Sequence, residues 1–316
     1  MSAVEGGGRL DSRKFVDPML TASGDARAFV KLTALETLWI NTGTLCNITC
    51  ANCYIESSPK NDRLAYISRS EVAAYLDEIE TDRLGTQLIG FTGGEPFMNP
   101  DFIAMLGDSL ERGHHTLVLT NAMKPMEQKR SGLLDLHKTH GQRLVIRVSI
   151  DHYTQAVHEG ERGGGTWAPM LEGLRWLHEH GFAINVAGRN LTGEPEAVLR
   201  QGFARMFRDL ALTLNAQNPV DLVVFPEMDA TADVPEITEA CWDILSVSPD
   251  AQMCASARMV VKRKAAARPA VIACTLLPYD QQFELGATLA EAARRVQLNH
   301  PHCARFCVLG GASCNA

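Results

Sequence analysis

The feature that most constrains the fold is a sixfold alternation of apolar segments of strand length with amphipathic segments of helix length. The expected strands are residues 36–40, 86–91, 115–120, 143–150, 182–188 and 221–225. Among the expected helices, one follows a cap at Ser70 and another is closed by Gly181. Apolar strands that alternate with helices form parallel sheets with helical crossovers. The sequence therefore predicts the α/β class and a partial (β/α)6 barrel, with its chemistry at the carboxyl ends of the strands.

The alternation ceases near residue 249, so three parts are expected. Residues 1–34 show little periodicity and are predicted to be an N-terminal extension that wraps or covers the domain. Residues 35–249 hold the partial barrel, whose last helix is expected at 236–245. Residues 250–316 are predicted to form a small cysteine-rich α+β extension, with a β-hairpin at 259–274 and an alanine-rich helix at 286–297.

Charge and hydropathy favour a cytoplasmic protein. The 316 residues carry a net charge of −7, which gives no electrostatic reason to expect nucleic acid or an anionic membrane surface as a partner. The polar, glycine-rich start MSAVEGGGRL is not a signal peptide, and no apolar run approaches the length of a membrane span. The nine cysteines are an odd number, so complete disulfide pairing within one chain is impossible.

The cysteines gather near the two ends of the chain, which suggests two metal sites. In LCNITCANCY (45–54), Cys46, Cys50 and Cys53 have the spacing C-x3-C-x2-C on a loop after the first expected strand. Three thiolates can bind three irons of a [4Fe–4S] cube and leave the fourth iron open to an outside ligand. A zinc site with its fourth ligand elsewhere, or simply buried thiols, are the alternatives that this spacing leaves open.

A second motif, FTGGEPFMNP (91–100), ends the second expected strand. Gly93 and Gly94 let the backbone approach a ligand closely, and Glu95 is an acceptor that can hold an ammonium group. Taken alone, the motif is also compatible with a glycine turn followed by a proline at a helix entry. Because both motifs stand at the ends of consecutive strands, a shared ligand site is the stronger interpretation.

The two motifs together resemble the signature of the radical S-adenosylmethionine (radical SAM) superfamily, over about residues 36–230. The resemblance implies that Cys46, Cys50 and Cys53 ligate a [4Fe–4S] cluster whose open iron is chelated by S-adenosylmethionine (SAM). It implies these SAM contacts: Thr92, Gly93, Gly94 and Glu95 for the methionyl amine, Ser149 and Asp151 for the ribose, Arg162 for the carboxylate, and Asn121 for the same pocket. For Arg162, a solvated surface position is the alternative. Asn52 departs from the family, which often has an aromatic residue before the third cysteine.

The later cysteines form a looser pattern. Cys254 and Cys274 bracket the expected hairpin, and the tail has the spacing Cys303-x3-Cys307-x6-Cys314. This arrangement is similar to the SPASM/Twitch type of extension and implies one auxiliary [4Fe–4S] cluster, because five thiols do not supply two complete ligand sets. Whether Cys303 or Cys307 is a ligand stays open, and a zinc knuckle is the alternative. Cys241, alone in an expected helix, is predicted to be a buried apolar side chain.

The resemblance implies an enzyme that cleaves SAM reductively to a 5′-deoxyadenosyl radical, which abstracts hydrogen from a small-molecule or short-peptide substrate. The outcome would be an oxidation, a cross-link or an epimerisation, and a reductant such as flavodoxin or ferredoxin would be needed. Glu227 and Asp229, after the sixth strand, are candidates for a general base, although solvent-facing loop carboxylates are common there. The short N-terminal segment is expected to lack a leader-binding domain. The alternative function is a non-enzymatic iron–sulfur or zinc protein for electron transfer or scaffolding.

Overall fold

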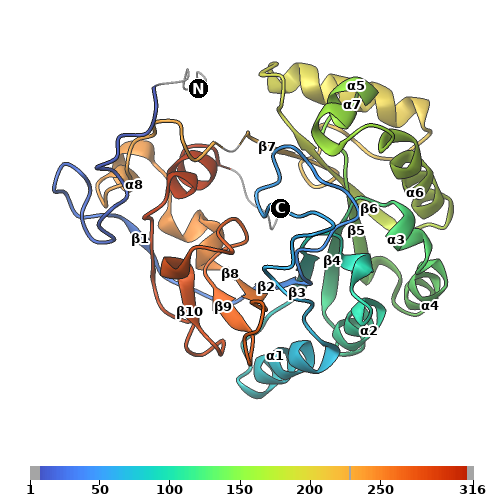
Figure 1. Cartoon of the computed structure of the whole chain (residues 1–316), viewed down its shortest axis with the longest axis horizontal. Helices are drawn as coiled ribbons and strands as arrows, with labels where there is room; N and C mark the ends of the chain where they lie inside the picture. Colours follow the sequence, from blue (N-terminus) through green and yellow to red (C-terminus); the bar gives the residue numbers. More distant parts are fainter. Residues whose placement is uncertain (1–7, 228, 312–316) are drawn as a thin grey trace.

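The computed structural model of the chain describes residues 8–227 and 229–311. Within these residues, a nine-stranded sheet has the order β10-β9-β8-β2-β3-β4-β5-β6-β7 (Figure 1). The strands that run parallel in chain order are β2 (Thr37–Asn41), β3 (Leu88–Thr92), β4 (His115–Thr120), β5 (Leu144–Ser149), β6 (Ala183–Arg189) and β7 (Leu222–Phe225). The mixed α/β fold with a central parallel sheet is therefore confirmed, and each of the six expected strands is present.

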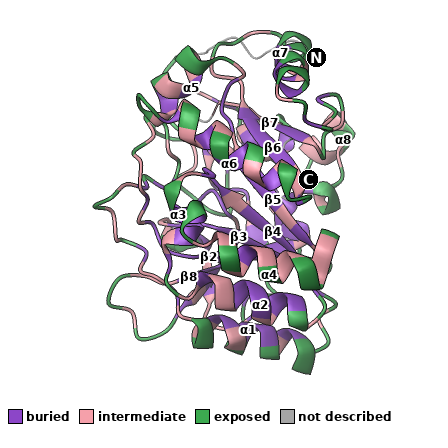
Figure 2. Cartoon of the chain, turned by 90° about the vertical axis from the view of Figure 1, so that its right-hand side faces the viewer, coloured by how far each residue is buried: buried purple, intermediate pink, exposed green. Residues whose placement is uncertain are grey.

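Helices cover the outer face of this sheet. They are α1 (Arg69–Thr81), α2 (Phe102–Glu111), α3 (Lys124–Glu127), α4 (Arg130–His140), α5 (Gln155–Arg162), α6 (Trp167–Glu179) and α7 (Glu196–Asp209). Figure 2 shows α1, α2, α4 and α6 in a row over the strands, with buried residues toward the sheet and exposed residues outward. This is the burial that an apolar stripe on each helix requires. Among the described residues, no helix is both long and apolar enough to span a bilayer.

Several helix boundaries differ from the prediction. The cap of α1 is Ser68 and not Ser70, because Ser68 and Glu71 bond each other's main-chain N–H groups in a capping box. Between β4 and β5 the chain forms two helices, α3 and α4. The last expected helix is reduced to α8 (Cys241–Leu245), and α5 was not predicted.

The C-terminal part continues the same sheet. The predicted hairpin is confirmed as β8 (Ala257–Val261) and β9 (Ala270–Ile272), which pair antiparallel. Strand β8 also pairs parallel with β2, and β10 (Glu284–Gly286) pairs with β9. The sheet thus runs on past residue 249, and the division of the chain at that point stays a prediction.

The predicted alanine-rich helix at 286–297 is wrong. The segment leaves β10 through Gly286, which has φ +147°, and returns as β11 (Val296–Gln297). The Glu291 carboxylate accepts the Ala287 N–H at 2.6 Å, and the buried Arg258 guanidinium donates to the Ala292 carbonyl at 2.9 Å. The side chains of Glu291 and Arg258 thus bind main-chain groups that a helix would pair internally, so alanine's helix propensity is overridden.

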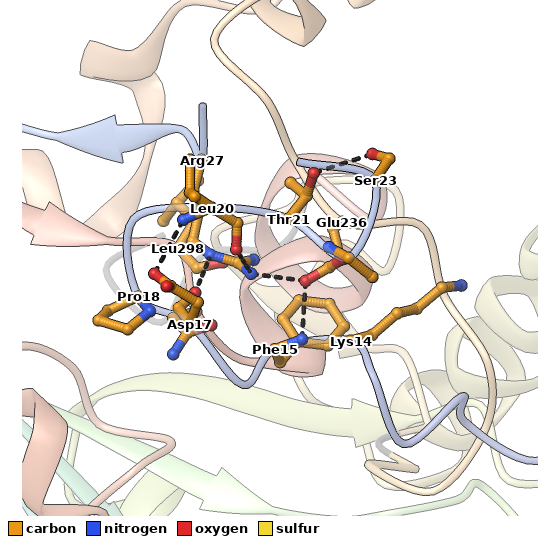
Figure 3. Close-up of polar contacts among 12 residues, drawn as sticks. Lys14, Phe15, Asp17, Pro18, Leu20, Thr21, Ser23, Arg27, Glu236 and Leu298 are labelled. Atoms are coloured by element: carbon orange, nitrogen blue, oxygen red, sulfur yellow. Dashed lines mark hydrogen bonds and ion pairs between the residues drawn. The ribbon is translucent and has the colours of Figure 1, made fainter. Parts of the chain in front are cut away.

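The N-terminal segment is fixed to the segment after β7 by a buried ion pair. The Arg27 Nη2 lies 2.5 Å from Glu236 Oε1, and both side chains are buried (Figure 3). The Glu236 carboxylate also accepts the N–H groups of Phe15 and Ala22, while Arg27 donates to the Leu20 carbonyl. Further along, β1 (Phe29–Val30) pairs antiparallel with β11. The N-terminal segment has no periodic pattern, and it is held in place because the side chains of Arg27 and Glu236 bond its main chain.

Candidate active site

The two sequence motifs meet where β2 and β3 end. The parallel register places Asn41 beside Thr92. The ladder then continues into the loops, because the Thr42 N–H donates to the Thr92 carbonyl at 2.8 Å and the Gly94 N–H donates to the Gly43 carbonyl at 2.8 Å. The cysteine loop and the GGEP loop are therefore joined by main-chain hydrogen bonds.

The glycines of the second motif are required by this junction. Gly93 has φ +141°, and a Cβ at Gly94 would lie 2.2 Å from the Leu45 carbonyl oxygen. A Cβ at Gly93 would lie 2.5 Å from the carbonyl oxygen of Gly43. Only residues without a Cβ allow the two loops to approach this closely. The sequence predicted that these glycines let the backbone approach a ligand. In the structure, the backbone that they approach is that of the loop before Cys46.

The three N-terminal cysteines line one cavity, which we call the cysteine-loop cavity. Cys46 is buried, Cys50 and Cys53 are half-buried, and none of these three is in a disulfide. The cavity is also lined by predicted SAM-contacting residues from the ends of β3, β4 and β5 and from the end of α5: Thr92, Gly93, Gly94, Asn121, Ser149 and Arg162. Residues that are far apart in the sequence therefore surround one space at the carboxyl ends of the strands.

The donor set of this cavity suits an iron–sulfur cube. Burial raises the pKa of Cys46 to about 12 and that of Cys50 to about 11, so a cation is needed beside these sulfurs if they are to ionise. Among the described residues, no three histidine, cysteine or carboxylate side chains lie close enough together to hold a single metal ion. A cube instead takes each thiolate at a different iron.

Glu95 stands behind the cavity wall. Its buried carboxylate accepts the Thr120 hydroxyl at 2.8 Å, the Asn121 N–H at 2.9 Å and the Phe97 N–H at 3.2 Å. Burial raises its pKa to about 7, although these three bonds oppose the shift. With both oxygens bonded to protein donors, Glu95 joins the loops after β3 and β4 and orients Asn121.

Arg162 and Asp151 are bonded to each other. The guanidinium makes a two-pronged contact, with Nη2 3.0 Å from one carboxylate oxygen and Nε 2.7 Å from the other. Arg162 is the last residue of α5, and its side chain is largely buried, so the solvated alternative is excluded. The pair lies where the cysteine-loop cavity adjoins a second cavity, because Ser149 and Arg162 line both.

The second cavity has a volume of about 150 Å³ and mostly apolar walls, and we call it the apolar cavity. It shares Cys50 and Cys53 with the cysteine-loop cavity. Its far wall contains Phe225 at the end of β7 and Phe306 from the C-terminal part, whose rings stack with centroids 5.8 Å apart. Sequence reasoning missed Phe306, although its position between Cys303 and Cys307 was a usable signal.

The two predicted general bases lie outside these cavities. Both oxygens of Glu227 accept from Arg189 Nη2, at 3.1 and 3.0 Å, and Arg189 itself lines the apolar cavity. The Asp229 carboxylate instead accepts the hydroxyl and N–H of Thr231, both at 2.7 Å, and these bonds lower its pKa. Among the described residues that line either cavity, neither carboxylate is found.

The C-terminal cysteines line a third cavity, the C-terminal cysteine cavity. Its thiols are those of Cys254, Cys274, Cys303 and Cys307. It adjoins the apolar cavity, since Leu276 lines both. Cys314 lies outside the described residues. Cys241 is half-buried and packs against the main hydrophobic core, and its sulfur accepts the Thr238 N–H at 3.4 Å, so the expectation of a buried apolar side chain is met only in part.

Comparison with known proteins identifies the class. The family model of the radical SAM superfamily matches residues 40–199. The chain belongs to the radical SAM superfamily, and it is therefore related to enzymes that use a [4Fe–4S] cluster and SAM.

Individual relatives match parts of the chain. The antilisterial bacteriocin subtilosin biosynthesis protein AlbA of Bacillus subtilis is 32% identical over 143 residues, which cover 45% of this chain and 30% of AlbA. The mycofactocin maturase MftC of Mycobacterium ulcerans is 29% identical over 142 residues, which cover 44% of this chain and 35% of MftC. The matched stretches thus span about a third of these relatives.

A solved structure extends the likeness of the fold. The crystal structure of Streptococcus suis SuiB bound to SAM superposes with a TM-score of 0.58 at 12% identity. The superposition covers 81% of this chain and 64% of SuiB. At this identity the likeness shows a common fold.

Proposed function

We propose that this protein is a radical SAM maturase in which Cys46, Cys50 and Cys53 hold a [4Fe–4S] cluster with SAM beside it. The observation that carries the proposal is the convergence of these thiols with Thr92–Gly94 and Ser149 on one cavity. That cavity adjoins the apolar cavity, where a substrate can lie next to bound SAM. In this proposal residues 35–249 form a partial barrel core.

The bound cluster and SAM supply a 5′-deoxyadenosyl radical that removes a hydrogen atom from the substrate. The chain's own residues would bind and orient SAM and the substrate. Ser149 would contact the ribose. Arg162, which is held by Asp151, would face SAM at the junction of the two cavities. Thr92, Gly93 and Gly94 would line the place of the methionyl ammonium, while Glu95 keeps Asn121 in place. The mostly apolar walls of the second cavity exclude water from the radical.

Residues 250–316 are proposed to be a SPASM/Twitch-like extension with one auxiliary [4Fe–4S] cluster. Its four ligands are Cys254, Cys274, Cys303 and Cys307, because these thiols line one cavity. This choice uses both Cys303 and Cys307. The apolar cavity adjoins both cysteine-lined cavities, so a substrate there would lie beside both groups of thiols, and an auxiliary cluster would supply an electron acceptor.

The substrate is proposed to be a peptide with an apolar side chain at the reacting position. Two observations support this class. AlbA is named for bacteriocin biosynthesis, and SuiB has been solved with its precursor peptide SuiA. Phe225 and Phe306 give the apolar cavity a wall that fits an apolar or aromatic group. The reaction takes place in the cytoplasm with a flavodoxin or ferredoxin as reductant, and Glu227 is the candidate base that Arg189 holds at the rim.

Anaerobic reconstitution tests the proposal. The wild type should bind about eight irons per chain, four for each cluster, and should cleave SAM to 5′-deoxyadenosine under reduction. Replacing Cys46, Cys50 and Cys53 by alanine should leave about four irons and abolish cleavage. Alanine at Cys254 and Cys274 should also leave about four irons but retain cleavage. Zinc binding without SAM cleavage would instead establish the scaffold alternative.

The substrate class is tested by deuterium transfer. Peptides deuterated at an apolar residue should pass the label into 5′-deoxyadenosine, and charged residues at that position should not. Replacing Phe306 by alanine should reduce this transfer, while SAM cleavage without substrate stays unchanged. Label transfer from charged peptides alone would reject the apolar class.

A further inference from the structure

Arg258 is a buried cation without a carboxylate partner. It lies in β8 with 1% of its surface exposed. Its guanidinium donates to the main-chain carbonyls of Cys254 at 2.6 Å, Ala257 at 2.7 Å, Ala292 at 2.9 Å and Arg294 at 3.1 Å. Within residues 8–227 and 229–311, no aspartate or glutamate forms an ion pair with it. Its hydrogen bonds are therefore satisfied, but its charge is not.

Three other arginines, the buried Arg27 and the half-buried Arg162 and Arg189, are paired with carboxylates. Arg27 pairs with Glu236, Arg162 with Asp151 and Arg189 with Glu161. A buried charge is costly unless an opposite charge or a metal centre compensates it. Arg258 has no such carboxylate partner among the described residues, and its guanidinium bonds the main chain of Cys254. A compensating anion is therefore expected close to the Arg258 guanidinium.

The C-terminal cysteine cavity is the place for that anion. Arg258 Nη1 bonds the carbonyl of Cys254, and Cys254 lines the cavity with Cys274, Cys303 and Cys307. A metal cluster bound by four thiolates carries net negative charge in the same cavity.

We propose that Arg258 is the buried counter-charge of an anionic iron–sulfur cluster in the C-terminal cysteine cavity and raises the reduction potential of that cluster. The inference rests on the proposed auxiliary cluster. Reduction adds one electron to an already negative centre, so a fixed positive charge stabilises the reduced form more than the oxidised form. Net charge and hydrogen bonding are established determinants of cluster potentials. Arg258 is therefore a positioning residue and not a catalytic one, because it contacts the main chain of the cluster ligand Cys254 and not the substrate.

The competing explanation gives Arg258 a packing role alone, as the donor that holds four carbonyls. Two variants separate the explanations. Arg258→Lys keeps the charge but makes fewer hydrogen bonds, whereas Arg258→Gln keeps a donor but removes the charge. Arg294→Gln is the matched control, because that side chain is exposed and donates to the Glu284 carbonyl at 3.0 Å.

The potential is measured on the full chain in which Cys46, Cys50 and Cys53 are alanine, so that one cluster remains. In a spectroscopic redox titration, Arg258→Gln should lower the midpoint potential, while Arg258→Lys and Arg294→Gln should stay near the parent value. An intact cluster with an unchanged potential in Arg258→Gln would overturn the inference. Absence of iron from the parent chain would instead contradict the auxiliary cluster itself.

A second measurement covers variants that hold the cluster weakly. Iron loading should raise the Tm of the parent chain more than that of Arg258→Gln, because the cation is uncompensated only in the metal-free protein. Equal rises in the two proteins would favour the packing role. Failure of both Arg258 variants to fold, with or without iron, would also assign Arg258 to packing and overturn the proposal.

Discussion

The Glu161 carboxylate accepts both the main-chain N–H of Asn52, at 2.9 Å, and its side-chain amide, at 3.0 Å. The Glu161 carbonyl also accepts the Ala51 N–H at 2.7 Å. Glu161, which precedes Arg162 at the end of α5, therefore holds the loop between Cys50 and Cys53 in place. Asn52 stands where the family often has an aromatic residue, and here its role is to anchor the cysteine loop by hydrogen bonds.

Glu161→Gln should loosen this turn. The amide keeps one acceptor, but its NH2 group then faces the donors of Asn52 and Arg189, so we expect a loss of about 1–2 kcal/mol in the free energy of unfolding. The N-terminal cluster should also be lost faster to a chelator, which absorbance reports. Glu227→Gln is the control, since Glu227 bonds Arg189 but not Asn52. Equal chelation rates in the two variants would show that the Asn52 contact does not hold the loop.

The strand–helix core could be predicted from the sequence because its signals are local. Each strand of β2–β7 is an apolar run, and both motifs follow strand ends whose positions the parallel register fixes. Helix α5 was missed because its buried positions are the polar residues His158 and Glu161, which give no apolar stripe. The pairing of β8 with β2 and the coil at 286–297 depend on tertiary partners such as Arg258, which no local pattern reveals.

The glycine pair offers a steric prediction. Gly94→Ala would place a Cβ 2.2 Å from the Leu45 carbonyl oxygen, which belongs to the backbone and cannot rotate away. We expect a loss of about 2–3 kcal/mol in stability and poor cluster incorporation, measured by denaturant unfolding and iron content. Gly164→Ala is the control, since a Cβ there meets nothing within 4 Å. A fully metallated, stable Gly94→Ala protein would contradict the junction of the two loops.

The N-terminal segment should depend on one ion pair. Arg27→Met leaves the Glu236 carboxylate buried beside the N–H groups of Phe15 and Ala22 but without its cation, which should cost about 3–5 kcal/mol. Lys14→Met breaks the more exposed pair with Asp233 and should cost less than about 1 kcal/mol. Denaturant midpoints of the two variants test the contrast. Similar small losses would mean that the segment contributes little to folding.

His158 should make the protein sensitive to acid. Its ring is fully buried and packs edge-on against Trp167, and neither nitrogen has a hydrogen-bond partner in the part of the chain that the structure describes. Burial, and then the Arg162 cation, lower its pKa from 6.5 to about 4, while Asp151 and Glu159 act in the opposite direction. Between these two values the unfolded chain binds a proton that the folded chain does not, so stability falls as the pH is lowered from 6.5 to 4.

The whole effect of His158 amounts to about 3 kcal/mol. His158→Phe removes the titrating group but keeps a ring against Trp167, so its unfolding free energy should fall less between pH 6.5 and pH 4 than that of the wild type. The same replacement at the exposed His115 should leave the slope unchanged. Parallel pH profiles for wild type and His158→Phe would show that folding does not lower the pKa of His158 and would contradict the prediction.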